Sequence, residues 1–188
     1  MKAAQATLLE ALEREAEAQE LLLAGERARA EPVLREVASL YRRSWDAAHP
    51  TAFGRLTGML KAAVIAGGGE EEAAFARAEV GVAETPAAAY AVAVAALVEG
   101  DADAASAAAR TMGEGDEAFA RAGEAITALA ARDGERYASA VESIVRDFEG
   151  REQHVTGVAI ADTALMLEEL AARRGLEAGV RSPLLPQR

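Results

Sequence analysis

His154 is the residue whose neighbours first suggest chemistry, because Glu149, Glu152 and Asp162 lie close to it in the sequence. Carboxylates and imidazole bind metals in helical bundles, where a glutamate and a histidine three residues apart project inward from one helix. Here Glu152 and His154 are two residues apart, and Arg151 occupies the position three before the histidine. The two side chains would therefore point to different helix faces. We expect no metal site here.

A second candidate group is the stripe Tyr41, Trp45 and His49, whose four-residue spacing places these side chains on one helix face. Such a stripe could stack a ligand. Tyr41 and Trp45 also continue an apolar stripe that begins at Val33, which favours a place in the core, and His49 would then end the helix. A pocket near Tyr41, Trp45 and His154 is the alternative.

Three consecutive glycines, Gly67–Gly69, precede a helix-like run and resemble a phosphate-binding loop. A phosphate loop of the common kind continues into Gly-Lys-Ser/Thr, whereas this one continues into Glu70, Glu71 and Glu72. Those carboxylates would repel an anion from the helix N-terminus, so a flexible linker is the better interpretation. The sequence also has no cysteine and no Gly-x-Ser-x-Gly elbow. We therefore expect a protein that is not an enzyme and that uses no cofactor.

Acidic residues outnumber basic ones by 31 to 20, giving a net charge of -11. This charge repels nucleic acids and anionic membranes, so we expect neither as a partner, whereas a protein with a basic face would be attracted. Solubility alone is the alternative explanation of the charge. The candidate partner-binding residues form two clusters at predicted helix corners, where they could line one edge of the molecule: Glu70, Glu71, Glu72, Glu114, Asp116 and Glu117.

Helix corners are marked by four glycines that each precede an acidic residue: Gly69, Gly100, Gly115 and Gly134. Glycine accepts the left-handed conformation that ends a helix, and a carboxylate favours the positive N-terminal end of the next helix. Gly69, Gly100 and Gly134 lie 31 and 34 residues apart, about the length of a repeating helix pair. Apolar residues recur with a helical period and never alternate over five residues or more. We predict an all-α fold, a single domain over residues 1–188 with seven to nine antiparallel helices stacked in pairs.

The apolar stripes also predict where each helix lies. Residues 1–30 contain an N-terminal amphipathic helix over 3–24, and the second helix is expected to start at Pro32 and to close at His49 and Pro50. Thr51 is expected to cap the third helix. The remaining helices are expected over residues 52–66, 70–82, 86–99, 101–112, 116–132, 135–154 and 157–174.

Two segments have particular roles in this arrangement. The helix over residues 86–99 is apolar nearly all round, so it should be the structural centre. The tail over residues 175–188 cannot stay helical past its prolines. Leu184 and Leu185 are expected to pack back on the bundle, with a partner-binding tail as the alternative.

The sequence also bears on the compartment. Residues 1–30 alternate apolar and charged side chains, unlike a secretory signal. The most apolar stretch runs from Ala87 to Val98, which is shorter than the roughly 20 residues of a membrane span. We expect a cytoplasmic protein.

Four segments of the last third of the chain suggest a family: Asp116–Phe119, Asp133–Ala138, Ala161–Leu165 and Ser182–Pro186. With them, this region resembles the C-terminal part of small helical immunity proteins, in particular the immunity protein 49 family of bacterial toxin systems. In such proteins a helical array ends in an Ala/Leu/Arg-rich helix, a glycine and a short tail with Ser-x-x-Leu-Pro. The resemblance implies a cytoplasmic inhibitor that binds a cognate toxin, and it assigns no functional residue in this chain.

The leading interpretation is therefore a non-enzymatic acidic protein-binding module, with an immunity protein that neutralises a toxin as its specific form. One alternative is a small-molecule-binding or enzymatic helical bundle with a pocket near Tyr41 and Trp45, and another is a self-associating structural protein. Large apolar residues exposed on one face would favour protein binding or self-association. An enclosed pocket with convergent polar groups would favour the small-molecule alternative.

Overall fold

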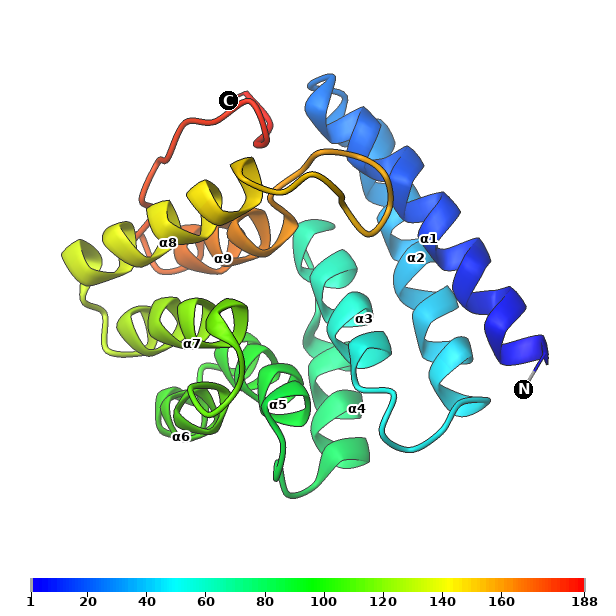
Figure 1. Ribbon diagram of the computed structural model, residues 1–188, viewed down its shortest axis with the longest axis horizontal. Coiled ribbons are helices and arrows are strands. Elements are labelled where there is room, and N and C mark those ends of the chain that lie inside the picture. The colour runs from blue at the N-terminus through cyan, green and yellow to red at the C-terminus, as the bar shows by residue number, and fades with distance from the viewer. Residues whose placement is uncertain (1, 188) are drawn as a thin grey trace.

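The computed structural model describes the backbone of residues 2–187 and the side chains of residues 5–187. Over this part of the chain it contains nine helices and no strand, and helices adjacent in sequence pack against each other in one all-α domain (Figure 1). The predicted fold class is therefore confirmed.

Side chains cap the N-termini of four of the helices in the described part of the chain. The helices are α1 (Lys2–Leu23), α2 (Arg27–Asp46), α3 (Gly54–Ile65), α4 (Glu70–Val80), α5 (Pro86–Glu99), α6 (Ala102–Met112), α7 (Glu117–Ala130), α8 (Gly134–Glu149) and α9 (Asp162–Ala172). Thr85 caps α5 by accepting a hydrogen bond from the backbone N–H of Ala88 at 3.3 Å. Gly100 ends α5 in the left-handed conformation, with φ at 77°. The bounds of α5 are thus those that the sequence predicts.

Helix α5 is the centre of the fold, as its apolar surface predicts. It packs against α3, α4, α6 and α7, and Ala95 near its middle is fully buried. Close helix approach is possible because the side chains are small. Between α6 and α7, for example, a Cβ at Gly123 would lie 2.9 Å from the carbonyl oxygen of Ala109. No helix in the described part of the chain is long and apolar enough to cross a membrane.

The predicted start of the second helix at Pro32 is wrong. Helix α2 begins at Arg27, and Pro32 lies inside it. A proline in this position removes the hydrogen bond to the carbonyl group of Ala28, four residues earlier. Both Ala28 and Pro32 lie on the exposed face of α2, so water can solvate that carbonyl, while the opposite face packs against α1 and α3.

The connection between α2 and α3 also differs from the prediction. Helix α2 ends at Asp46, before His49. Thr51 does not cap α3, whose N-cap is Phe53; instead, Thr51 Oγ1 and His49 Nδ1 form a hydrogen bond of 2.9 Å. These two polar side chains satisfy each other within the turn, so neither is available to the helix.

The predicted glycine corner at Gly134 is made by a different residue. Arg132 adopts the left-handed conformation, with φ at 57°, and Gly134 is already the first residue of α8. Asp133 between them caps α8 through the backbone N–H of Arg136.

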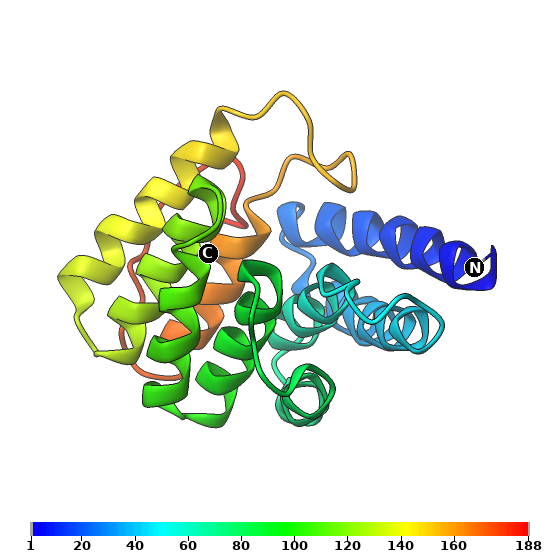
Figure 2. The same cartoon turned by 60° about the horizontal axis from the view of Figure 1, so that its bottom comes forward.

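The longest departure from the predicted helices lies between α8 and α9. Helix α8 ends at Glu149 rather than near His154, and residues 150–161 form a loop. Gly150 is the C-cap of α8, and the guanidinium of Arg151 folds back to 3.7 Å from the ring centre of Phe148. The loop reaches from the end of α8 toward α1 (Figure 2), where the hydroxyl of Thr156 donates a hydrogen bond to Gln19.

The tail after α9 packs back on the bundle as predicted. The carboxylate of the buried Glu168 on α9 accepts hydrogen bonds of 3.0 Å from the backbone N–H groups of Ala178 and Gly179. Leu185 is buried, and Leu184 packs against the core. A charged side chain of α9 therefore fixes the start of the tail, and leucines fix its end.

Candidate functional site

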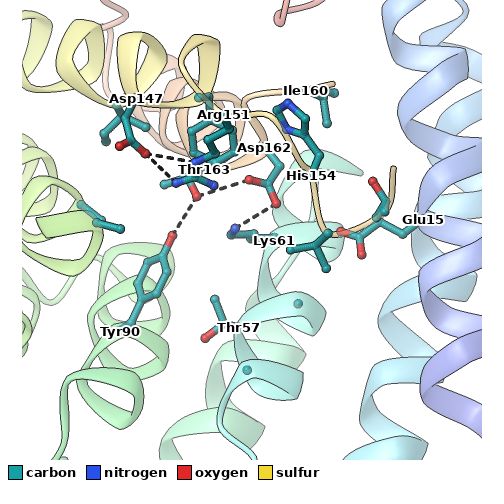
Figure 3. A pocket seen from close by; sticks show the side chains of 18 of the residues that line it. Glu15, Thr57, Lys61, Tyr90, Asp147, Arg151, His154, Ile160, Asp162 and Thr163 are labelled. Carbon is teal, nitrogen blue, oxygen red and sulfur yellow. Dashed lines mark hydrogen bonds and ion pairs between the residues drawn. The ribbon is translucent and has the colours of Figure 1, made fainter. Parts of the chain in front are cut away.

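A pocket of about 420 Å³ lies between α1, α2 and α3 on one side and α5, α7, α8 and α9 on the other. Residues 150–161 add a further wall. Figure 3 shows Lys61 and Asp162 side by side in the middle of the pocket lining, with Tyr90 on one side of them and Glu15 of α1 on the other. The volume falls within the range of about 300–1,000 Å³ that is typical of ligand pockets.

Lys61 on α3 and Asp162 at the start of α9 form an ion pair, with Nζ and Oδ2 2.9 Å apart. Burial lowers the pKa of Lys61, but the Asp162 carboxylate and its hydrogen bond raise it by more, so Lys61 keeps its positive charge. The network extends through Thr163, whose hydroxyl donates to Asp162 Oδ1 at 3.3 Å and accepts from the Tyr90 hydroxyl at 3.4 Å. The ammonium group is therefore fixed by partners from α5 and α9.

Glu15 on α1 is buried, with 7% of its surface exposed, and accepts a hydrogen bond of 2.6 Å from the hydroxyl of Tyr41 on α2. Burial raises the pKa of Glu15 to about 7, although the Tyr41 hydrogen bond and the Lys61 charge act in the opposite direction. Burial and the Glu15 carboxylate also raise the pKa of Tyr41, so its hydroxyl stays a protonated donor. Glu15 thus lies in the pocket wall with a neutral partner.

Gly58 on α3 makes this pairing possible. A Cβ at this position would lie 2.6 to 2.8 Å from three atoms of the Tyr41 ring, too close for any side chain. The absence of a side chain at Gly58 therefore lets the ring lie directly against α3 and reach Glu15.

The opposite part of the pocket is formed by α7, α8 and the loop. Asp147 accepts hydrogen bonds from Arg121 at 2.5 Å and from Arg151 at 2.6 Å. The ring centres of His154 and Phe148 are 6.2 Å apart, and Phe119 packs edge to face with Tyr90 across the pocket wall at 6.1 Å. Aromatic rings with paired charges around them suit a ligand that combines an apolar body with a polar end.

The predicted stripe of aromatic residues is divided by the structure. Tyr41 and His154 line the same pocket, but Trp45 does not. The indole of Trp45 instead donates a hydrogen bond of 2.9 Å to Glu79 and packs against Phe53. Tyr41 and Trp45 are both buried, which confirms their predicted place in the core. His49 is exposed and lies outside the pocket.

The residues around His154 do not gather into a metal-binding group. His154 lies in the loop, Glu149 ends α8, and Asp162 pairs with Lys61. Among the described residues, no group of three or more histidine, cysteine, aspartate or glutamate residues could hold a metal ion.

The two acidic clusters lie at opposite ends of α5. Gly69, which precedes Glu70–Glu72, lies beside Val98 near the end of α5. Gly115, which lies between Glu114 and Asp116 of the second cluster, is beside Pro86 at the start of α5. The helix between Pro86 and Val98 is about 18 Å long. The structure therefore does not bring the two clusters together on one edge.

The members of these clusters also differ in their surroundings. Glu70 and Glu117 have side chains that are 75% and 88% exposed. The carboxylate of Asp116 caps α7 by accepting hydrogen bonds from the N–H groups of Ala118 and Phe119, and Asp116 lines the pocket. Binding of a protein partner by these residues stays a prediction.

Sequence reasoning missed Glu15, Lys61 and Asp162 as residues of one site. A signal for Glu15 was present, because it falls within the apolar stripe of α1, three residues after Leu12 and four before Gln19. A carboxylate in such a stripe needs a partner, since burying an unpaired charge is costly. No comparable local pattern connects Lys61 with Asp162.

Comparison of the chain with protein-family models, with curated proteins and with solved structures finds no match. The resemblance to the immunity protein 49 family therefore stays a prediction.

Proposed function

We propose that this chain is a small-molecule-binding protein whose ligand occupies the pocket beside α1, α3, α5 and α9. The observation that carries this proposal is the convergence of a buried pair, Glu15 with Tyr41, and a partly buried ion pair, Lys61 with Asp162, on a cavity with a mostly apolar lining. A few polar groups in a mainly apolar cavity are typical of ligand sites, where they fix the orientation of the bound molecule.

The free energy that it costs to take these polar groups out of water supports the same proposal, because stability alone does not require them. Buried charges are expensive to desolvate, and a well-packed apolar replacement is often as stable as a buried ion pair or more so. The rest of this core consists largely of alanine, leucine and valine. Departures from such a regular pattern are expected at functional sites.

The protonation states favour binding over covalent catalysis. A lysine nucleophile needs a lowered pKa, whereas the pKa of Lys61 is raised. The pKa of the Tyr41 hydroxyl is also raised, so it donates a hydrogen bond rather than acting as a base. The groups are thus suited to holding a ligand.

A fragment library screened by thermal shift, with hits measured by calorimetry, tests the proposal. Ala87→Trp adds bulk to the pocket wall, and Ala107→Trp makes the same change at an exposed position on α6. A ligand at 100 times its Kd should stabilise the protein by about 2.7 kcal/mol. Binding should be lost in Ala87→Trp and kept in Ala107→Trp. Hits that bind both variants equally, or a library with no hits, would contradict the proposal.

A protein partner with a basic face is a second proposal, favoured by the high exposure of Glu70 and Glu117. Because the clusters lie at opposite ends of α5, reversing Glu70, Glu71 and Glu72 to lysine tests one end separately. The matching reversal of Glu114, Asp116 and Glu117 tests the other end. A partner that copurifies from the native cell should associate more slowly with only one of the two variants, and this difference in association rate should shrink above about 0.15 M salt. An association rate that changes neither with salt nor with either of the two reversals would contradict this proposal.

A further inference from the structure

The charged groups that line the pocket do not balance in pairs. The carboxylates are Glu15, Asp116, Asp147 and Asp162, and the cations are Lys61, Arg121 and Arg151. Every one of these cations already has a carboxylate partner: Lys61 pairs with Asp162, Arg151 pairs with Asp147, and Arg121 pairs with Asp147 and also with Glu117, which lies outside the pocket lining. The pocket therefore has no cation left over for an anionic ligand.

Glu15 is the carboxylate that remains. Its Oε2 accepts the hydrogen bond from Tyr41, which is a neutral donor. Among the described residues, no basic side chain forms an ion pair with Glu15, and its Oε1 accepts no hydrogen bond. Asp116 differs from Glu15, because its carboxylate is used to cap α7.

We infer that the ligand carries a protonated amine, which forms an ion pair with Glu15, on an apolar body that packs against the aromatic rings of the pocket. The inference rests on the proposed function, since it names the chemical class of the ligand for the same pocket. The rings of Tyr41, Tyr90 and Phe119 suit both parts of such a molecule, because aromatic faces attract cations as well as apolar groups.

The groups that face Glu15 from neighbouring elements are consistent with a cationic ligand. They are Tyr41 from α2, Lys61 from α3 and Asp162 from α9. Lys61 alone would repel an amine, but Asp162 lies 2.9 Å from its ammonium and balances that charge. With Glu15 ionised, these groups carry one excess negative charge, which a bound ammonium neutralises. An anion would have to displace Asp162 and face Glu15.

Three probes of matched shape test the inference: 4-phenylbutylamine, 4-phenylbutan-1-ol and 4-phenylbutyrate, each titrated calorimetrically into the full chain at pH 8. The amine should bind about tenfold or more tighter than the alcohol, as a charge-assisted hydrogen bond in a buried site provides. The carboxylate should bind more weakly than the alcohol. Glu15→Gln should remove the preference for the amine while keeping the affinity for the alcohol.

Glu10→Gln is the matched control, because it makes the same change on α1 at an exposed position outside the pocket. This variant should keep the preference for the amine, and far-ultraviolet circular dichroism should show both variants folded. A second readout is proton release at pH 6.5, measured in buffers of different ionisation enthalpy. Amine binding should release a proton from Glu15 in the unmodified protein and not in Glu15→Gln.

Equal affinities for amine and alcohol, tighter binding of the carboxylate, or an amine preference that survives Glu15→Gln would each overturn the inference. Failure of the proposed function looks different. If none of the three probes binds but library ligands do, and Ala87→Trp removes them, the inference fails and the pocket remains a ligand site. If nothing binds, both fail.

Discussion

Lys61 and Asp162 are 101 residues apart in the chain, yet Nζ of Lys61 lies 2.9 Å from Oδ2 of Asp162 in the lining of the pocket. The pair joins α3 to the first residue of α9, where a carboxylate is also favoured by the helix dipole. Because the two side chains are only 15% and 22% exposed, solvent screens their attraction weakly.

Replacing one member of this ion pair should lower the free energy of unfolding more than replacing both members with apolar residues. We expect Lys61→Met to lower the free energy of unfolding by about 2 to 3 kcal/mol, because Asp162 keeps a poorly solvated charge. The double variant with Asp162→Leu should lose less than the sum of the two single variants. Guanidinium denaturation followed by circular dichroism measures the cycle, and purely additive losses would show that the pair is not coupled.

Gly58→Ala should destabilise the protein, although alanine is normally better than glycine in a helix by about 1 kcal/mol. The added Cβ would lie as close as 2.6 Å to the Tyr41 ring and would push its hydroxyl away from Glu15. A loss of about 1 to 3 kcal/mol is expected from such overpacking. Gly54→Ala is the control, because a Cβ there meets nothing within 4 Å. Thermal melts should separate the two variants, and equal melting temperatures would refute the close contact.

The pH dependence of stability should report the environment of Glu15. Its pKa is raised from 4.5 to about 7 on folding, so at intermediate pH the folded protein holds this proton more tightly than the unfolded chain. The resulting stabilisation is complete below about pH 4.5 and is lost as the pH rises through 7. Relative to Glu15→Gln, the unmodified protein should lose about 3 kcal/mol between pH 4 and 8. Parallel stability curves for the two proteins would contradict the burial of the Glu15 carboxyl beside a neutral partner.

Ala95→Glu should unfold the domain or come close to it. Ala95 is fully buried in α5, and a carboxylate there would have no partner, at a cost of several kcal/mol against a typical total of about 5 to 15. Ala107→Glu, on the exposed face of α6, should change the melting temperature little. Similar melting of the two variants would contradict the central position of α5.

Local chemistry explains which helices are predictable from the sequence. Thr85, Pro86 and Gly100 delimit α5 because a cap, a first-turn proline and a left-handed glycine each act within one turn. The loop over residues 150–161 was not predictable in this way, because its conformation depends on contacts such as Arg151 on Phe148 and Thr156 with Gln19.

The pocket depends even more on contacts between distant segments. Tyr41 and His154 were named as residues of one possible pocket, and the structure places both in its wall. Trp45 was grouped with them because of its spacing from Tyr41. It lies one helical turn after Tyr41, however, and its indole donates a hydrogen bond to Glu79 outside the pocket lining. Charge pairing across 101 residues, as between Lys61 and Asp162, leaves no pattern within a helix.

The most direct test of the ligand pocket is a titration of the isotopically labelled protein with 4-phenylbutylamine, followed by nuclear magnetic resonance. We predict saturable shifts that cluster at Glu15, Tyr41, Lys61, Tyr90 and Asp162, and in Glu15→Gln the same shifts should need about tenfold more amine to saturate. Shifts that are absent, or that cluster away from this pocket, would contradict the account.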